Sequence, residues 1–133
     1  MSQRCMRIMM IDNDPAAHCY HKAIIEKSGL NKIIVEDYLE VDTALKNIQK
    51  IVQNGQMDHL PDVILVDINM PNEDGWSFVE QLGKMKTLQK FPKIFMVSNS
   101  LNPIDKMKVE NNTFVHDFKQ KFLGLEFFKQ LAP

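Results

Sequence analysis

Acidic, hydroxyl and ammonium side chains stand at or just beyond the ends of short apolar runs in this sequence. The residues in question are Asp12, Asp67, Ser98 and Lys121. Carboxylates that gather in one place repel one another, and a bound cation is the usual reason that a protein tolerates them. Oxygen ligands without histidine or cysteine favour Mg²⁺ or Ca²⁺. A divalent cation beside a lysine suits a phosphoryl group. Asp67 is then a candidate nucleophile, because an aspartate can form an acyl phosphate.

These side chains can meet only if the apolar runs are strands of one sheet. The expected strands span residues 7–11, 32–38, 63–66, 94–97 and 113–118. Segments with helical periodicity lie between them and after the last one. Five strands alternating with five helices predict an α/β fold, a doubly wound five-stranded parallel sheet with helices on both faces. Ligands bind such sheets outside the carboxyl ends of the strands, where the polar residues fall.

The first two expected helices carry start signals. We expect Asp14 to cap the first helix, with Pro15 at its first position, and Asp42 to cap the second. The apolar stripe expected on the first helix is Ala16, Tyr20, Ala23 and Ile24. His18 and His21 share a helix face at a spacing of three residues. Because no acidic or cysteine partner accompanies them, we expect both on the surface rather than at a metal.

The composition is that of one ordinary globular domain spanning residues 1–133. The chain is 44% hydrophobic and 25% charged, with a net charge of -1, so nothing indicates a nucleic-acid or anionic-membrane binder. The N-terminal segment has no signal-peptide core, and no apolar run approaches the roughly 18 residues of a membrane helix. We therefore expect a cytoplasmic protein, with Cys5 and Cys19 as reduced thiols in or near the core.

The segment around Asp67 resembles the phosphoacceptor segment of response regulator receiver domains. Asn69 follows two residues after the aspartate, Met70 and Pro71 come next, and Gly75 takes the eighth place. Three further segments resemble the family in the right order along the chain: 11–15 its first acidic cluster, 96–98 its switch serine or threonine, and 118–121 its aromatic residue and lysine. The resemblance implies the strand order 2-1-3-4-5 that the chemotaxis member of this family shows.

The resemblance also implies a role for each matching residue. Asp67 would accept the phosphoryl group, Lys121 would pair with its oxygens, and Ser98 would donate a hydrogen bond to it. Phe118 would turn inward as Ser98 moves, which would change the face formed by the fourth helix, the fifth strand and the fifth helix. The implied cofactor is Mg²⁺, and its implied ligands are Asp12, Asn13, Asp67 and the backbone carbonyl of Asn69.

Three positions depart from the family. Asn13 replaces the second acid of the usual pair and supplies an oxygen without a charge, which predicts weaker metal binding unless Asp14 compensates. Phe122 follows Lys121 where the family usually has a cis proline, so either a cis or a trans bond presents the lysine. Asn99 follows Ser98 where the family often has a small residue, and its bulk can impede or redirect the water that removes the phosphoryl group.

The implied function is a phosphoacceptor switch of a two-component phosphorelay, phosphorylated by a sensor histidine kinase or a histidine phosphotransfer protein. It would catalyse only its own phosphorylation and dephosphorylation. Because residues 1–133 hold no output domain, the output would be contact with an unidentified downstream protein, and the face of the last two helices could also form a homodimer. The alternative is a receiver-like module that binds proteins without phosphorylation, which Asn13 and Phe122 favour and Asp67, Ser98 and Lys121 oppose.

Other proteins of this architecture fit the sequence less well. A flavin carrier needs a phosphate loop rich in serine, threonine and glycine after the first strand, and residues 12–15 are the opposite of that. A phosphatase of the haloacid dehalogenase type needs Asp-x-Asp there, which Asp12 and Asp14 imitate. Pro15 follows this motif, however, and the main acidic loop comes after the third strand.

Overall fold

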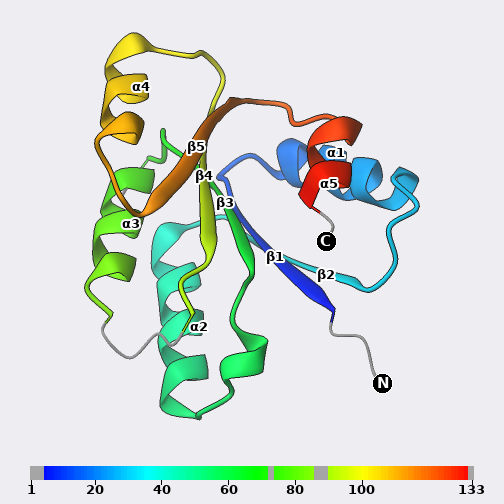
Figure 1. The fold of residues 1–133 in the computed structure, drawn as a ribbon, viewed down its shortest axis with the longest axis vertical. Coiled ribbons are helices and arrows are strands. Elements are labelled where there is room, and N and C mark those ends of the chain that lie inside the picture. Colours follow the sequence, from blue (N-terminus) through cyan, green and yellow to red (C-terminus); the bar gives the residue numbers. More distant parts are fainter. Residues whose placement is uncertain (1–4, 72–73, 86–89, 132–133) are drawn as a thin grey trace.

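Five parallel strands form a single sheet in the computed structural model, which describes residues 5–71, 74–85 and 90–131. The strands are β1 (Met6–Ile11), β2 (Ile33–Tyr38), β3 (Val63–Asp67), β4 (Lys93–Ser98) and β5 (Val115–Gln120). Their order across the sheet is β2-β1-β3-β4-β5, as Figure 1 shows. The predicted doubly wound parallel sheet and its strand order are therefore confirmed.

The helices lie in two layers, one on each face of the sheet (Figure 1). They are α1 (Pro15–Lys27), α2 (Val41–Gln53), α3 (Gly75–Gly83), α4 (Pro103–Glu110) and α5 (Leu125–Leu131), with a short 3₁₀ turn, η1, at Met57–His59. Helices α1 and α5 cover one face, and α2, α3 and α4 lie on the other. Within the described residues, no helix has both the length and the apolar character that crossing a membrane requires.

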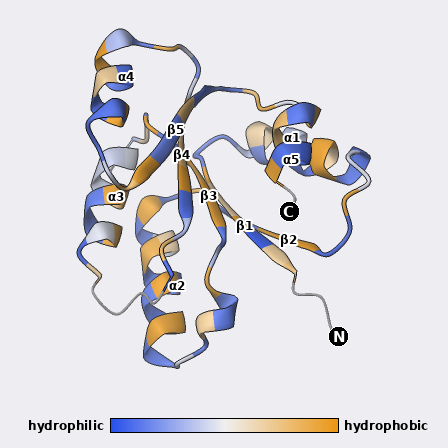
Figure 2. Cartoon of the chain, viewed as in Figure 1, coloured by the Kyte–Doolittle hydropathy of each residue, from blue (hydrophilic) through white to orange (hydrophobic). Residues whose placement is uncertain are grey.

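Alternation along the central strands supplies a core on both faces of the sheet. On β1, Met9 and Ile11 join the apolar cluster under α2 and α3, while Ile8 and Met10 join the cluster under α1 and α5. The buried lengths of β1, β3 and β4 are accordingly runs of apolar residues, and Figure 2 shows orange stretches along the central strands between hydrophilic positions. Because both faces are buried, polar residues can appear only where a strand ends.

Two helix starts show how far local signals reach. The Asp14 carboxylate caps α1 as predicted, accepting a hydrogen bond from the Ala16 backbone N–H at 3.0 Å. The prediction for Asp42 was wrong, because α2 begins at Val41 and Glu40 takes the cap position, two residues before Asp42, without a side-chain hydrogen bond. Asp42 instead lies in the first turn and pairs with Lys46 at 3.0 Å. A carboxylate in a first turn still favours the helix through its dipole.

The buried face of α1 differs from the predicted stripe. The residues that it buries are Ala17, His18, His21 and Ile25. Tyr20 is exposed, and so is Cys19, which corrects the expectation that both cysteines lie in or near the core. The spacing of apolar residues does not predict this face, because two of its four residues are histidines. Both histidines are buried with hydrogen-bond partners for their rings.

Strand β5 also lies two residues further along the chain than residues 113–118. It runs to Gln120, which pairs in register with Ser98 of β4, after an irregularity of pairing between Ile94 and Phe95. This edge strand is exposed at several positions, so its apolar pattern is weak and its limits are set by pairing with β4. The extension carries the chain to Lys121 beside the end of β4.

Candidate functional site

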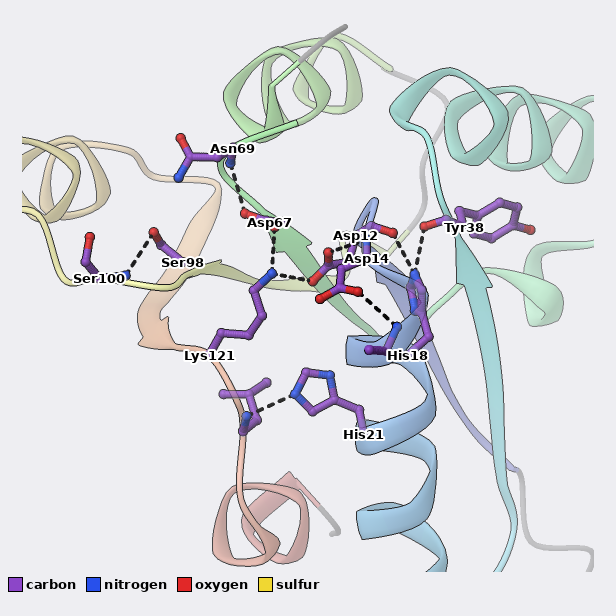
Figure 3. Close-up of polar contacts among 12 residues, drawn as sticks. Asp12, Asp14, His18, His21, Tyr38, Asp67, Asn69, Ser98, Ser100 and Lys121 are labelled. Carbon is purple, nitrogen blue, oxygen red and sulfur yellow. Dashed lines mark hydrogen bonds and ion pairs between the residues drawn. The ribbon is translucent and has the colours of Figure 1, made fainter. Parts of the chain in front are cut away.

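Asp12 and Asp67 face one another at the carboxyl edge of the sheet. Strands β1 and β3 are neighbours, paired in register up to Ile11 and Val66, and each aspartate comes next in its strand direction. The Asp12 and Asp67 residues are only 7% and 5% exposed. The ammonium nitrogen of Lys121 lies 2.9 Å from Oδ2 of each carboxylate (Figure 3). Three of the predicted site residues thus form one buried cluster, although more than fifty positions separate Lys121 from Asp67.

The other oxygen of each carboxylate is held by backbone. Oδ1 of Asp12 accepts a hydrogen bond from the Asp14 N–H at 2.9 Å, and Oδ1 of Asp67 accepts one from the Asn69 N–H at 2.9 Å (Figure 3). Each aspartate therefore binds its own loop through Oδ1 and presents Oδ2 to Lys121. The backbone that follows each strand therefore fixes the orientation of both carboxylates. A fixed orientation of this kind favours a reaction at one carboxylate oxygen.

Burial is the largest single influence on the pKa values of Asp67 and Lys121. Burial raises the pKa of Asp67 above its ordinary value, and the neighbouring Asp12 charge adds to this, although Lys121 and the Asn69 N–H oppose it. Burial alone would lower the pKa of Lys121, but its hydrogen bonds to Asp67 and Asp12 outweigh that effect and raise it. The positive charge of Lys121 therefore opposes the effect of burial on the Asp67 carboxylate.

Ser98 ends β4 at the same edge and is 2% exposed. Its hydroxyl oxygen accepts a hydrogen bond from the Ser100 N–H at 3.4 Å, and its carbonyl oxygen accepts one from the Lys121 N–H at 2.7 Å. The Lys121–Phe122 peptide bond is cis, which resolves the two possibilities left by the sequence. Asn99 is exposed, and its carbonyl accepts a hydrogen bond from the Gln120 side chain at 3.1 Å. Ser98 thus ties the strand that carries it directly to Lys121.

Phe118 lies on β5 opposite Met96, two residues before Ser98 on β4. Its side chain is half-buried and packs against the core cluster beneath α2 and α3. The structure therefore places the predicted aromatic switch residue on the strand that leads to Lys121, on the face of the sheet that α4 also occupies.

The chemistry of the donor set fits a hard divalent cation. Asp12 and Asp67 supply carboxylate oxygens, and the Asn69 carbonyl belongs to the loop that Asp67 anchors. Among the described residues no three histidine, cysteine or acidic side chains converge on one point. Mg²⁺ does not require that, because it is usually held by one or two carboxylates and keeps several waters. The residues present therefore fit Mg²⁺, while leaving no dedicated cage for it.

Asn13 and Asp14 differ in how they relate to the cluster. Asn13 is exposed and lines a surface cavity of about 480 Å³ together with Glu40, Met70 and Pro71. The Asp14 carboxylate is engaged as the cap of α1, while its N–H holds Asp12. Asp14 is thus a structural residue of this loop. Its contacts do not turn its carboxylate towards the cluster, where it could replace the acid that Asn13 lacks.

Gly75 closes the loop after β3 against the phosphoacceptor candidate. A Cβ atom at this position would lie 2.5 Å from the Asp67 carbonyl oxygen and 3.2 Å from the Ile68 Cα. The Gly75 N–H donates to the Ile68 carbonyl at 3.0 Å, which holds the two segments together. The absence of a side chain is therefore what allows α3 to begin directly against the end of β3.

His18 and His21 do not lie on the surface where their sequence context predicts them. Both are buried, at 4% and 5% exposure, and the expectation of a surface position was wrong. Nε2 of His18 lies 2.7 Å from the Asp12 carbonyl oxygen and 3.2 Å from that of Tyr38. Nε2 of His21 accepts a hydrogen bond from the Leu123 N–H at 3.0 Å. Their spacing indicated a shared face, but no local signal indicated that this face turns inward.

The neutral, buried state of His21 makes the protein sensitive to acid. Burial lowers the pKa of His21 from 6.5 to about 4, with smaller opposing and supporting effects of Asp12, His18 and Lys121. The unfolded chain therefore binds a proton more readily, and the stability that His21 contributes is complete above about pH 6.5 and lost towards pH 4. We expect the free energy of unfolding to fall by about 2 kcal/mol between about pH 7 and about pH 5 from this residue.

Urea unfolding of the wild-type protein and of His21→Gln at both pH values measures this contribution. Glutamine can still accept the Leu123 hydrogen bond but does not titrate, so the pH-dependent difference between the two proteins isolates the histidine. Parallel loss of stability in both proteins would assign the acid sensitivity to other groups.

Known proteins resemble this chain both in sequence and in structure. Residues 8–126 match the family described as "Response regulator receiver domain". "Sensor histidine kinase CheAY" of Helicobacter pylori is 34% identical over 70 residues, or 53% of this chain and 8% of that protein. "Virulence transcriptional regulatory protein PhoP" of Salmonella typhimurium is 28% identical over 76 residues, or 57% of this chain and 29% of that protein. The matches thus span less than a third of these curated relatives.

Solved structures share the fold over nearly the whole length. A two component response regulator from Cytophaga hutchinsonii superposes with a TM-score of 0.84 at 21% identity, covering 97% of this chain and 95% of that one. A response regulator receiver protein from Dyadobacter fermentans gives 0.78 at 22% identity, covering 96% and 94%. Chemotaxis protein CheY4 of Vibrio cholerae gives 0.75 at 21%, covering 96% of each chain. At these identities the likeness establishes the fold.

Proposed function

The chain belongs to the response regulator receiver family of two-component signalling, and we propose on this premise that Asp67 is its phosphoacceptor. The observation that carries the proposal is the buried cluster in which Lys121 lies 2.9 Å from both Asp67 and Asp12. Of the two acids, Asp67 is the nucleophile, because its loop follows β3 at the centre of the carboxyl edge and holds the Asn69 backbone beside it.

The proposed reaction transfers a phosphoryl group from a phosphohistidine to Asp67. A carboxylate oxygen forms a bond to phosphorus, the bond from phosphorus to the histidine nitrogen breaks, and the imidazole leaves with that electron pair and takes up a proton. Such a transfer needs little covalent help from the protein and depends on positioning and charge. Lys121 pairs with the phosphoryl oxygens, and the Ser98 hydroxyl donates a hydrogen bond to one of them. Bound Mg²⁺ would neutralise charge on the same oxygens.

Phosphorylation is proposed to act through β4, β5 and α4. A 2.7 Å hydrogen bond joins the backbones of Ser98 and Lys121. A phosphoryl group that contacts both side chains would therefore pull on the ends of β4 and β5 together. Phe118 lies on the second of these strands and is half-buried, which leaves it room to change its burial. The proposed output is a change in the face that α4, β5 and α5 present to a downstream protein.

Intact mass spectrometry after incubation with acetyl phosphate and Mg²⁺ tests the central claim. We expect a single phosphoryl adduct that disappears without Mg²⁺ and that is absent from a variant lacking the Asp67 carboxylate. No adduct under any condition of donor and Mg²⁺ concentration would indicate a receiver-like module that binds its partners without phosphorylation.

Asn13 is proposed to make the Mg²⁺ site weak. We expect Asn13→Asp to tighten Mg²⁺ binding by about 10-fold, because another full charge near the ion adds on the order of 1–2 kcal/mol. The intrinsic fluorescence of Trp76, which follows Gly75, can report the titration. Gln56→Glu is the matched control, since it adds the same charge in the α2–β3 connection, away from the carboxyl edge. Sub-millimolar affinity of the wild-type protein would contradict the proposed role of Asn13.

The phosphodonor is proposed to contact an aromatic pair beside the cluster. Tyr20 and Phe122 are each 44% exposed, their rings lie 4.9 Å apart, and Phe122 directly follows Lys121. Exposed aromatic pairs of this kind often anchor protein interfaces. A sensor histidine kinase or histidine phosphotransfer protein must bring its phosphohistidine to this edge, so it is the proposed partner.

Tyr20→Ala should therefore separate protein donors from small ones. We expect transfer from a phosphorylated phosphotransfer protein of the same organism to slow by about 10-fold, a typical effect of an aromatic interface anchor. Phosphorylation by acetyl phosphate should remain unchanged. Ile104→Ala serves as the control, because Ile104 is 66% exposed on α4 and lies outside the proposed contact. Equal slowing with both donors would mean that Tyr20 affects the phosphoryl transfer step and not the binding of the protein donor.

A further inference from the structure

The two buried histidines of α1 contact opposite sides of the candidate site. His18 reaches the Asp12 carbonyl at the end of β1 and the Tyr38 carbonyl at the end of β2. His21, one turn further along the helix, reaches the Leu123 N–H in the loop that carries Lys121. Figure 3 shows both rings extending from α1, one towards each loop. One helix therefore holds both the segment of the first aspartate and the segment of the lysine.

The contacts require different tautomers of the two rings. Both partners of His18 Nε2 are carbonyl oxygens, which can only accept, so Nε2 of His18 must carry a hydrogen. The partner of His21 Nε2 is a backbone N–H, which can only donate, so Nε2 of His21 must be bare and its hydrogen must lie on Nδ1. The pair thus forms three directed hydrogen bonds that no apolar side chain of similar size could replace.

The loop from Lys121 to Leu123 is held at both ends. The Lys121 N–H donates to the Ser98 carbonyl at 2.7 Å, and the Leu123 N–H donates to His21 at 3.0 Å. His21 is itself enclosed by aromatic rings, with ring centres of Phe122 at 5.6 Å and Phe128 at 6.0 Å. Removing the imidazole nitrogen would release the side of the loop that faces α1, and the Lys121 ammonium would lose its fixed approach to Asp67.

We propose that His18 and His21 are positioning residues for phosphoryl transfer, holding the Asp12 segment and the Lys121 loop at one separation across the acceptor Asp67. The inference rests on the proposed function of Asp67. His21 touches neither the acceptor nor a proposed metal ligand, so its effect is exerted through the Lys121 loop alone, and it is the better of the two for a test.

The kinetic test compares three variants of the full chain. His21→Leu keeps a side chain of similar volume but removes the nitrogen that accepts the Leu123 hydrogen bond. We expect the initial rate of adduct formation from acetyl phosphate to fall by about 10-fold. In His21→Gln an amide oxygen takes the place of Nε2, and the rate should return to within about two-fold of the wild-type rate. Ile25→Ala removes a buried side chain from the same helix and should leave the rate of the folded protein unchanged. Rates are compared at a temperature at which circular dichroism shows every variant folded.

Nitrogen-15 NMR of the wild-type protein measures the tautomer of each histidine ring, so this second test requires no variant. We expect the hydrogen of His18 on Nε2 and that of His21 on Nδ1, and the opposite assignment for either ring would overturn the inference. A folded His21→Leu that is phosphorylated at the wild-type rate would overturn it as well, while leaving Asp67 as the acceptor. A wild-type protein that forms no adduct would instead remove the proposed function, and this inference with it.

Discussion

Asp67→Asn is expected to abolish the phosphoryl adduct that acetyl phosphate forms with the wild-type protein. An amide cannot form an acyl phosphate under these conditions, so the loss should be complete and not a change of rate. The side chain keeps its size, and its oxygen can still accept the hydrogen bond that the Asn69 N–H gives to Oδ1 at 2.9 Å. Lys121 retains Asp12 as a partner at 2.9 Å. The variant should therefore fold, and intact mass at neutral pH measures the outcome.

Asp74→Asn is the matched control for this experiment. Asp74 is an exposed carboxylate of the same loop, and it caps α3 by accepting a hydrogen bond from the Ser77 N–H at 2.9 Å. Asparagine caps helices about as well, so the loop should keep its structure. The adduct should persist in this variant. An adduct on Asp67→Asn that peptide mapping assigns to Asp12 would mean that the other buried aspartate is the acceptor.

Gly75→Ala is expected to impair both stability and phosphorylation. The added methyl group would lie 2.5 Å from the Asp67 carbonyl oxygen, and the atoms it meets are all backbone, so no side chain can rotate away. The hydrogen bond from the Gly75 N–H to Ile68 resists separation of the two segments. We expect the free energy of unfolding to fall by about 3 kcal/mol, as for a severe overpacking change. Displacement of Asp67 should slow phosphorylation by about 10-fold or more.

Gly124→Ala provides the comparison, because a Cβ at that position would have no atom within 4 Å. Its effect on stability should stay within about 0.5 kcal/mol. Urea unfolding and the initial rate of adduct formation, measured on both variants, test the claim. If Gly75→Ala matched Gly124→Ala in both measurements, the loop after β3 would be able to move without cost, and the close contact would have no part in placing Asp67.

The cluster also explains why three widely separated segments must fold together for the site to exist. Asp12 and Asp67 come from neighbouring strands, and Lys121 reaches them only because β5 pairs with β4 as far as Gln120. A buried lysine between two buried carboxylates loses hydration, and it is retained only where its partners are in place. The same contacts that prepare the proposed transfer therefore stabilise this edge of the sheet only in the native arrangement.

Much of this arrangement could be predicted from local features of the sequence. Apolar runs that end in Asp12, Asp67 and Ser98 predicted three strand ends, because a strand buried on both faces can carry polar groups only where it leaves the core. Asp14 followed by Pro15 predicted the start of α1. Because parallel strands present their carboxyl ends at one edge of a sheet, these residues could be predicted to lie close together.

The tertiary structure alone decided which polar residues of α1 are buried. His18 and His21 looked like surface residues because the sequence does not show that their rings meet backbone groups of other segments. Their partners are the carbonyls of Asp12 and Tyr38 and the N–H of Leu123, which lies 102 positions away from His21. A helix face is buried when its polar atoms find partners, and such partners are set by the packing of distant segments.

The difference between these outcomes has one physical reason. Periodicity, caps and strand ends depend on residues within a few positions of one another, so the amino-acid sequence by itself determined the sheet, its order of elements and the edge at which the acids gather. Hydrogen bonds between loops depend on separations that only the packed sheet fixes. The tertiary structure therefore decided the 2.9 Å approach of Lys121 to both carboxylates, the exposed position of Asn13 and the hydrogen bonds of the two buried histidines.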